Sequence, residues 1–345
     1  MDIKQASFRL GRKGDLIKDG SNEKWTETER RQREVEPTGT HYIGMGVSGG
    51  YQAARRAPSL SPGGTKEALD LAFPFLQKIA AKGSKGNVCV AKTGPGGSGH
   101  YDKMVHNGIK QGMMTPLNLE TGHHVLSNVR DKVVQDADNS EGTGAWACEE
   151  VVRLHVPGPT ILSSHLLRLA SADATKRKMI LQAFGSRVGN PSMIETDKSA
   201  FLRDLRDAVY ASFLASFIQG LHTLARADEE YGWGIEFRAV LQVWRAGCII
   251  RCNALVDLLD GVYANDDAGR CDKAKLLSHP VLGAEIQRAY PGIQASRGPC
   301  DRSGPEADLD YFGEHMFDLK TEAPGAEEGV ASFLVASGAG IRQDG

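Results

Sequence analysis

The sequence predicts an α/β segment followed by a large all-α region. Short strand-like runs of apolar residues occur early in the chain, at 15–20, 41–43 and 87–91, and helical or glycine-rich stretches separate them. From residue 100 onward, apolar residues recur instead with helical spacing, and hardly a convincing strand is found. An α/β unit that leads into a helical domain accounts for both observations.

Local signals place each element in order. Residues 15–20 predict a short strand and turn, and Thr26 is the predicted N-cap of a polar helix. Residues 41–43 predict a second strand before a glycine loop at 44–50, and residues 66–82 an amphipathic helix interrupted by a proline. Residues 87–91 predict the third strand, which precedes a second glycine loop at 94–99. Helices are then predicted over 100–135, 145–156, 160–186, 200–230 and 236–262.

Composition and charge narrow the classes of function. Lys and Arg number 41 against 43 Asp and Glu, a formal net charge of -2, which argues against a nucleic-acid partner. The longest uncharged apolar stretch, 208–225, contains Gln219 and His222 and predicts a buried core helix, not a membrane span. The N-terminus has no apolar signal region, and six cysteines in 345 residues form no disulfide framework. We therefore expect a cytoplasmic protein with no membrane partner.

A glycine pattern between residues 44 and 49 imitates a cofactor fingerprint. Gly44-Met45-Gly46-Val47-Ser48-Gly49 satisfies G-x-G-x-x-G. The fingerprint requires a helix of several turns after its third glycine, and Pro58 arrives too soon for one. We therefore reject a dinucleotide loop here. Two interpretations stay open: backbone N–H groups and the Ser48 hydroxyl that face an anionic ligand, or a tight turn that merely needs glycine.

The helix predicted after residue 100 has an unusual polar face. Lys103, His106, Asn107 and Lys110 follow at i, i+3, i+4 and i+7, which places them on one side of the helix. A lysine crowded by a second cation has a lowered pKa and can act as a base. The alternative is a solvated face, which Gly108 and the methionine-rich continuation fit poorly.

A metal site is not predicted. Cys248 and Cys252 lie four apart, but no partner pair at zinc spacing accompanies them, so we expect them to pack in the core.

Several motifs, in a consistent order, together carry a family resemblance. They are Tyr42–Gly50, Pro58–Leu60 with Pro62–Gly64, Gly99–Tyr101 with Lys103–Ile109, Tyr231–Trp233, Trp244–Arg251, and Asp310–Gly313 with His315. In these motifs the sequence resembles the 6-phosphogluconate dehydrogenases, from about Asp15 to Lys320. The resemblance implies oxidation of 6-phosphogluconate by NADP with release of CO2, giving ribulose 5-phosphate. It also implies a cytosolic homodimer of the pentose phosphate pathway and gluconate utilisation.

The same resemblance implies a domain organisation. Residues 1–95 would be the remnant of a Rossmann-type NADP-binding domain, and 96–320 an all-helical dimerisation and substrate domain. Residues 321–345 are rich in Gly, Ala and Glu and are expected to be disordered. The family's first strands and dinucleotide loop have no expected counterpart before Asp15, and residues 1–14 are expected to be unrelated to them.

Roles for individual residues follow from the resemblance alone. Lys103 would be the general base, and Asn22 would lie between substrate and nicotinamide. The predicted substrate contacts are Ser48, Gly49, Gly50, His106, Asn107, the phosphate-binding Arg168, and His315, which would reach into the partner subunit's site.

The sequence also departs from the family pattern. Lys110 stands at the general-acid position, where the family has glutamate, and Gln111 replaces the following tyrosine. Residues 142–147 lack the lysine and the second threonine of the family's phosphate-binding run. Two hypotheses result: an NADP-dependent enzyme with impaired catalysis, or an inactive homologue that dimerises or binds sugar phosphate without turnover.

Overall fold

The structure is a computed structural model that describes residues 12–120, 142–172, 197–264 and 279–295, with a few helical residues between 175 and 182. The chain forms two compact units. Unit 1 comprises residues 1–110, 141–156 and 220–273, and unit 2 comprises 111–140, 157–219 and 274–345. Two long helices, α5 (Ser98–Glu120) and α10 (Lys198–Tyr231), contribute to both. The predicted domain bounds near residues 95 and 320 stay a prediction, and residues 321–345 lie outside the described part of the chain.

A three-stranded sheet organises unit 1. Strands β1 (Leu16–Asp19), β2 (His41–Ser48) and β3 (Ser59–Gly64) lie in that order. β1 and β2 are parallel and β2 and β3 antiparallel. The parallel pair is joined through α2 (Trp25–Val35) and a 3-10 turn (Glu36–Thr38), which makes a βαβ unit. The carboxyl ends of β1 and β2 therefore lie at one edge of the sheet.

Three local predictions are corrected by the structure of unit 1. β2 continues through Ser48, so residues 44–48 form a strand and not a loop. β3 contains Pro62 and two glycines and was not predicted, whereas the strand predicted at 87–91 is present only as isolated bridges at Val88 and Val90. α2 begins at Trp25 after Lys24, with no side-chain cap, so the predicted capping by Thr26 is wrong.

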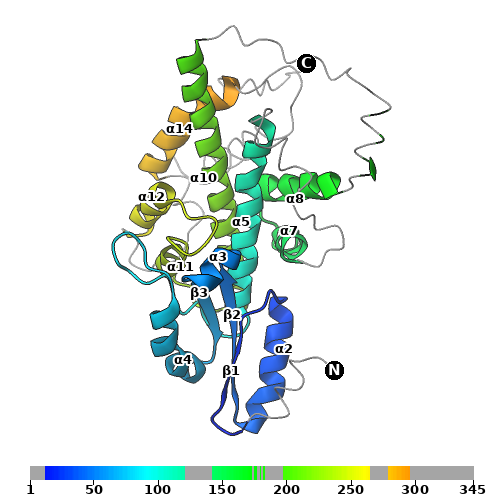
Figure 1. Cartoon of the computed structure of the whole chain (residues 1–345), viewed down its shortest axis with the longest axis vertical. Helices are drawn as coiled ribbons and strands as arrows, with labels where there is room; N and C mark the ends of the chain where they lie inside the picture. Colours follow the sequence, from blue (N-terminus) through cyan, green and yellow to red (C-terminus); the bar gives the residue numbers. More distant parts are fainter. Residues whose placement is uncertain are drawn as a thin grey trace, which may run out of the picture. The chain divides into compact units, whose positions relative to one another are not determined.

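The two faces of β2 have opposite character. Ile43, Met45 and Val47 pack in an apolar cluster with Leu69 and Leu76 of α4 (Lys66–Ile79). The alternate residues, which point to the other face because side chains alternate along a strand, include two glycines that contact α2 and α5. Helices α2 and α4 thus flank the sheet from opposite sides (Figure 1).

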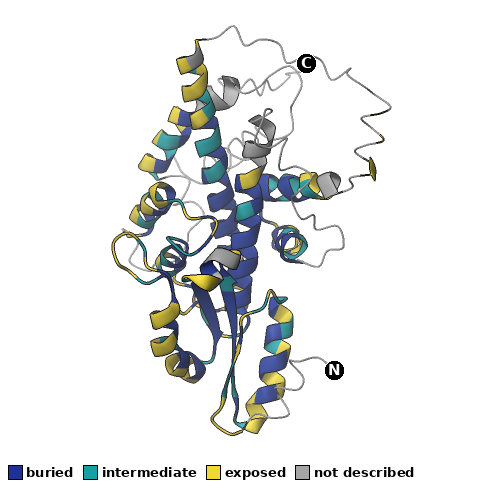
Figure 2. Cartoon of the chain, viewed as in Figure 1, coloured by how far each residue is buried: buried dark blue, intermediate teal, exposed yellow. Residues whose placement is uncertain are grey.

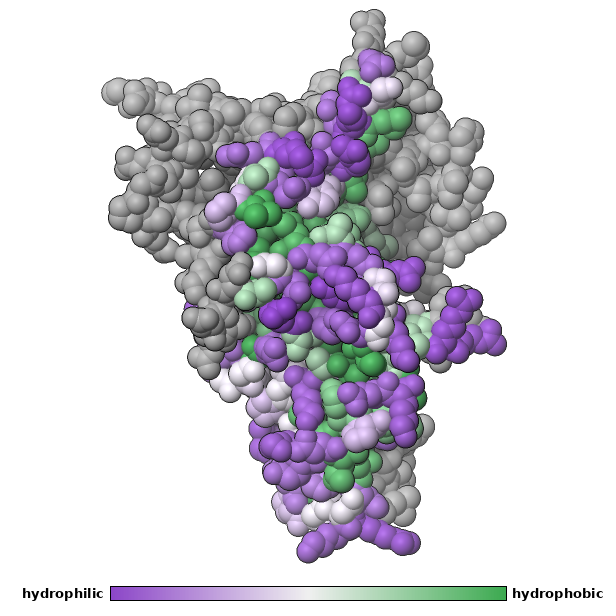
Figure 3. All heavy atoms as spheres, turned by 90° about the vertical axis from the view of Figure 1, so that its left-hand side faces the viewer, coloured by the Kyte–Doolittle hydropathy of each residue, from purple (hydrophilic) through white to green (hydrophobic). Residues whose placement is uncertain are grey.

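Helix α4 confirms the amphipathic helix predicted from residue 66. The Thr65 hydroxyl caps it by accepting a hydrogen bond from the Ala68 amide at 3.3 Å, and Pro74 lies within the helix without ending it. Leu71, Phe75 and Ile79 form an exposed apolar stripe along α4. The space-filling view from this side shows apolar atoms interspersed among polar ones (Figure 3).

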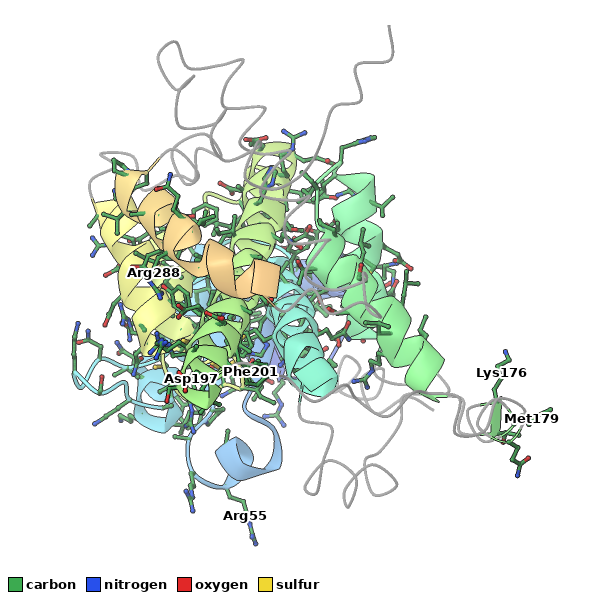
Figure 4. All side chains as sticks on the ribbon, turned by 90° about the horizontal axis from the view of Figure 1, so that it is seen from above. Arg55, Lys176, Met179, Asp197, Phe201 and Arg288 are labelled. Carbon is green, nitrogen blue, oxygen red and sulfur yellow. The ribbon has the colours of Figure 1, made fainter. Side chains whose placement is uncertain are left out.

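Unit 1 contains further described helices besides α2, α4 and the first turns of α5. They are α3 (Gly50–Arg55), α7 (Thr143–Arg153), the last turns of α10, α11 (Phe237–Val243) and α12 (Asn253–Ala264). The single helix predicted over 236–262 is broken between α11 and α12, where Gly247 has a φ of 70°. The side chain of Arg55, the last residue of α3, projects outward (Figure 4).

Unit 2 contains the remainder of α5 and α10 together with α8 (Pro159–Ala172) and α14 (Pro280–Ala295). The Gln219 side-chain oxygen accepts hydrogen bonds from the amides of Thr160 and Ile161 at 3.1 and 3.2 Å, which satisfies the first turn of α8. Arg288 of α14, labelled in Figure 4, lies on that helix. It donates a hydrogen bond to Asp207 of α10 at 2.9 Å.

Helix α10 is the buried core helix that the sequence predicted. By length and composition it could cross a membrane, but 83% of its most apolar window is buried inside the protein. Figure 2 shows that the sheet and the first turns of α5 are likewise mostly buried.

Candidate functional site

The site forms where α5 crosses β2 with almost no side chain between them. A Cβ atom on Gly46 would lie 2.6 Å from the Lys103 Cβ, and one on Gly99 would lie 2.4 Å from the Gly44 carbonyl oxygen. Contacts this close require glycine on both elements. The glycines at 44 and 46 therefore serve helix–strand contact and do not form a tight turn.

A hydrogen-bonded cluster of polar side chains lies at the end of β2. Lys103 Nζ donates to Ser48 Oγ at 3.0 Å and to Asn107 Oδ1 at 3.1 Å. Asn107 Nδ2 donates in turn to Thr143 Oγ1 at 2.8 Å, at the start of α7. All four side chains are buried, and Lys103 is only 9% exposed. Three of the predicted site residues thus lie in direct contact.

His106 completes this cluster as a neutral imidazole. Its pKa lies well below the ordinary 6.5, chiefly because the ring is buried and also because Lys103 and Lys110 place positive charge near it. Its Nδ1 lies 3.1 Å from Asn107 Oδ1, and since an amide oxygen only accepts, Nδ1 carries the proton. Nε2 is then a bare acceptor, buried and without a hydrogen-bond partner in the described part of the chain. It is suited to accept a hydrogen bond from a ligand hydroxyl.

Lys110 follows on the same face of α5, two helical turns after Lys103. It is half-buried, and its charge contributes to the lowered pKa of His106. The helix face therefore presents two cations on either side of one neutral imidazole. The polar face predicted from the spacing is confirmed, and its alternative, a solvated face, is wrong because three of its four residues are buried.

Asp102 is a buried carboxyl group beside Lys103 that the sequence did not single out. Ser61 Oγ of β3 donates a hydrogen bond to it. Burial raises its pKa from the ordinary 3.8 to about 6, against hydrogen bonds from Ser61 and Trp244 and the positive charge of Lys103. It is 1% exposed. The site thus includes a carboxyl that titrates near neutral pH.

Asn22 lies after the carboxyl end of β1 and is exposed. The turn before it is held by Asp19, which accepts hydrogen bonds from the Ser21 amide at 3.1 Å, the Ser21 hydroxyl at 2.6 Å and the Tyr42 hydroxyl at 2.6 Å. Burial alone would raise the pKa of Asp19, but these bonds outweigh it and lower the pKa to about 2. The carboxylate is therefore ionised at every physiological pH.

The remaining predicted residues have different placements. Gly49 and Gly50 form the turn between β2 and α3, with φ values of 103° and 58°. A Cβ on Gly49 would lie 2.3 Å from the Gly247 carbonyl oxygen, so this turn also requires glycine. Arg168 belongs to α8 in unit 2 and is half-buried, and His315 lies outside the described residues.

Cys248, considered and set aside as a metal ligand, is buried. Its thiol donates to the Trp244 carbonyl oxygen at 3.1 Å, and burial raises its pKa to about 12. That placement is the core role expected of it.

Sequence reasoning missed two further members of the site. Thr143 lies in the segment that the resemblance assigns to phosphate binding. Its contact with Asn107 was not predicted, because the two residues are 36 positions apart and no local pattern links them. Asp102 gave no signal because its partner Ser61 lies on a strand that was itself not predicted.

Two family models match the chain. The family model described as the NAD binding domain of 6-phosphogluconate dehydrogenase matches residues 3–94, and that of the 6-phosphogluconate dehydrogenase C-terminal domain matches 118–301. The first match includes most of residues 1–14, so the expectation that this segment is unrelated to the family domain is wrong. The predicted fold class, an α/β domain of Rossmann type followed by a helical domain, is confirmed.

Curated relatives and a solved structure extend the likeness over most of the chain. A decarboxylating 6-phosphogluconate dehydrogenase of Emericella nidulans is 36% identical, across 93% of this chain and 80% of its own length. One from Synechococcus elongatus is 32% identical, across 88% and 73%. The Plasmodium falciparum enzyme, solved in apo form, with NADP+ and with 6-phosphogluconate, superposes with a TM-score of 0.75 at 27% identity, across 90% and 74%. The chain therefore belongs to the 6-phosphogluconate dehydrogenase family.

Proposed function

We propose that this chain binds 6-phosphogluconate at the Lys103 cluster and oxidises it with NADP, with loss of CO2 to give ribulose 5-phosphate. The observation that carries the proposal is a buried amine, Lys103 Nζ, which donates hydrogen bonds to Ser48 and to Asn107. The same Asn107 oxygen lies 3.1 Å from Nδ1 of His106, whose Nε2 is a bare acceptor. Alcohol oxidation requires a positioned base that takes the hydroxyl proton, and a buried amine held by hydrogen bonds can serve as that base. The relatives named as decarboxylating 6-phosphogluconate dehydrogenases support the assignment.

In this proposal Lys103 is the general base. Its neutral form takes the proton of the substrate's C3 hydroxyl, and its ammonium form returns a proton to the resulting keto oxygen when CO2 leaves. Asn107 and Ser48 orient the amine, since both are within 3.1 Å of Nζ. His106 accepts a hydrogen bond from a neighbouring hydroxyl of the sugar acid. Ser48, Gly49 and Gly50 border the same position at the end of β2.

The described residues fit the nicotinamide end of NADP. In sheets with parallel strands, ligands bind outside the carboxyl ends of the strands, and both Asn22 and Ser48 lie at that edge. Asn22 is exposed there on a turn that Asp19 fixes. We propose Asn22 as the residue between substrate and cofactor. Bound NADP+ supplies the hydride acceptor. Gly44 and Gly46 do not fit the pyrophosphate, because both lie within β2 against neighbouring side chains.

The wider setting of the enzyme is also a proposal. It would act as a cytoplasmic homodimer in the pentose phosphate pathway and gluconate utilisation, without a nucleic-acid or membrane partner. Arg168 would bind the substrate phosphate, and His315 would reach the partner subunit's site. Family membership and the near-neutral formal charge support this setting.

A second candidate function is binding of sugar phosphate without turnover. Lys110 favours it, because a cation occupies the position from which the resemblance expects a carboxylic acid to protonate the enediol carbon. A lysine in place of glutamate changes the group that could donate the proton. It also adds positive charge near Lys103, which alters the electrostatic environment of that amine.

One experiment separates the two functions. Purified protein is incubated with 6-phosphogluconate and NADP+, and NADPH is followed by absorbance, with Lys103→Met as the test variant and the exposed Lys78→Gln as the control. The proposed function predicts turnover that Lys103→Met lowers by about 10²-fold or more and that the control leaves unchanged. Saturable binding of 6-phosphogluconate without NADPH formation would instead establish the second function.

A further inference from the structure

We propose that Asp102 is a positioning residue for Lys103, whose carboxylate balances the positive charge that the amine acquires when it takes a proton from the substrate. The inference rests on the proposed function, in which Lys103 is the base, and adds the group that sets the strength of that base.

The two side chains lie on neighbouring strands of the sheet. The first carbon of the Lys103 side chain lies against Gly46 of β2, where an added Cβ would be 2.6 Å from it. Asp102 accepts a hydrogen bond from Ser61 Oγ of β3. Gly46 and Ser61 are register partners in the antiparallel pair of β2 and β3. Two consecutive residues of α5 are therefore fixed at one level of the sheet, the lysine on β2 and the carboxyl on β3.

The same register sets the separation of the two charges. Lys103 Nζ donates to Ser48 Oγ at 3.0 Å, and Ser48 lies two residues beyond Gly46 on β2. Two residues of a strand span about 7 Å and adjacent strands lie about 4.8 Å apart, which places the ammonium group about 8 Å from the carboxylate. Asp102 therefore acts on the amine through its charge.

Burial keeps this charge effective. Asp102 is 1% exposed and Lys103 is 9% exposed, so water screens the pair little. Burial raises the pKa of Asp102 to about 6, and the positive charge of Lys103 opposes that rise. The carboxyl is therefore ionised above neutral pH, and the electrostatic interaction between the two groups is evident from the side of the carboxyl as well.

Two cysteine thiols face Asp102 from the elements packed against it. Cys248 follows α11, and burial raises its pKa to about 12. Cys89 accepts a hydrogen bond from the amide of Leu60 in β3 through its carbonyl oxygen, and burial raises its pKa as well. Neither thiol becomes an anion in the pH range where Asp102 titrates.

The remaining titratable groups near the pair belong to α5 itself. His100 faces α2. His106 is neutral, and the positive charges that lower its pKa, after the larger effect of burial, are those of Lys103 and Lys110. Of the groups named here, Asp102 alone is an anion at neutral pH, so it offsets the two lysines of this helix.

The proton balance of the oxidation gives the consequence. The C3 carbon loses a hydride to NADP+, which becomes NADPH, and the C3 hydroxyl loses its proton to Lys103 Nζ. The hydroxyl O–H bond breaks, an N–H bond forms, and the amine becomes an ammonium group. A nearby carboxylate stabilises that product, so it makes the neutral amine a stronger base.

The size of the effect follows from the separation. At an effective dielectric constant of about 20, two unit charges about 8 Å apart change the proton affinity of either group by about 10- to 30-fold. Loss of the carboxylate should lower the proton affinity of Lys103 by this factor. Because a weaker base abstracts a proton more slowly, the oxidation step should slow by about 3- to 5-fold.

The first arm of the experiment measures the amine itself and needs no turnover. Protein labelled with carbon-13 at the lysine ε carbons is titrated by NMR, and Lys103 is assigned from the signal that Lys103→Met lacks. We expect Asp102→Asn to move the Lys103 midpoint to lower pH by about one pH unit or more. Ser61→Ala removes a hydrogen bond but keeps the charge, and should move the midpoint by less than half as much. The exposed Asp257→Asn is the control without effect, and circular dichroism verifies that each variant is folded.

The second arm measures turnover. NADPH formation from 6-phosphogluconate is followed between pH 5.5 and 9.5 for the wild type and Asp102→Asn. The acid limb of kcat/KM should move to lower pH in the variant, and kcat on the plateau should fall by about 3- to 5-fold. KM should change by less than about twofold, because Asp102 faces β3 and removes no uniform binding of the substrate when it is replaced.

The outcomes separate this inference from the proposed function. An unchanged Lys103 midpoint in Asp102→Asn overturns the inference, and so does an equal shift in Ser61→Ala, which would assign the effect to packing. An acid limb that stays in place in an active Asp102→Asn variant also overturns it, while the proposed function stands. A wild type that forms no NADPH, with the midpoint still shifted in Asp102→Asn, overturns the proposed function and supports the charge coupling.

Discussion

Replacing the buried carboxyl of Asp102 by an amide should stabilise the protein at alkaline pH. Asp102 is 1% exposed, and its pKa is raised by burial from 3.8 to about 6. A carboxyl whose pKa is higher in the folded state binds protons better when folded. The stability that it contributes is fully present below about pH 4 and is lost as the pH rises through 6.

The size of this effect follows from the two pKa values. Each tenfold change in proton affinity corresponds to about 1.4 kcal/mol. The raised pKa of Asp102 therefore destabilises the folded state by about 3 kcal/mol at pH 8, where the carboxyl is ionised in both states. At pH 5 the cost is about 1.5 kcal/mol, because the carboxyl is ionised when unfolded and mostly protonated when folded. Asp102→Asn removes that cost, because the amide is neutral and Ser61 can exchange its role of donor for that of acceptor. The gain in the free energy of unfolding should therefore double between pH 5 and pH 8.

Urea denaturation at pH 5, 6.5 and 8 measures the gain directly. Asp257→Asn is the matched control, because Asp257 is exposed, its pKa is lowered by a hydrogen bond from Arg245, and its replacement should bring no gain at any pH. An Asp102→Asn variant that is equally or less stable than the wild type at pH 8, or whose gain does not change with pH, would refute the reasoning.

Three further predictions concern the same unit. Gly46→Ala should lower the free energy of unfolding by about 1–3 kcal/mol and displace α5, because its Cβ would lie 2.6 Å from a side chain of that helix, whereas Gly261→Ala, with nothing within 4 Å, should be neutral or stabilising in thermal denaturation. The imidazole of His106 should show constant NMR shifts between pH 5.5 and 8, since its pKa lies well below 6.5, and a titration in that range would contradict the assignment. Tyr101→Phe removes the 3.0 Å hydrogen bond to the buried Glu150 and should cost about 1.5–3 kcal/mol in urea denaturation; a smaller loss would mean that Glu150 finds another donor.

The parts of the fold that the sequence predicted are those set by local periodicity. The helical face of Lys103, His106 and Asn107 followed from spacing alone, since i, i+3 and i+4 residues meet on any helix. The amphipathic pattern of α4 likewise placed that helix correctly from its first residue.

The strands were predicted less well because tertiary contacts determine them. Gly44 and Gly46 favour a loop by propensity, but they continue β2 because α2 and α5 lie against them and leave no space for a side chain. β3 contains a proline and two glycines, and it exists because β2 supplies its hydrogen-bond partners. Thr143 joined the site for the same reason, through a contact 36 residues distant that no local pattern records.

Direct contact between the backbones of β2 and α5 bears on how this family's site can vary over evolution. The position of Ser48 relative to Lys103 depends mainly on the main-chain atoms of β2 and α5, which meet without an intervening side chain. Core residues on the α4 side of β2 can therefore drift, and neighbouring surface residues can change charge, while the amine keeps its position. Such a site tolerates altered chemistry at one residue, such as Lys110, without loss of the frame that holds the others. New specificities can arise on it by single substitutions.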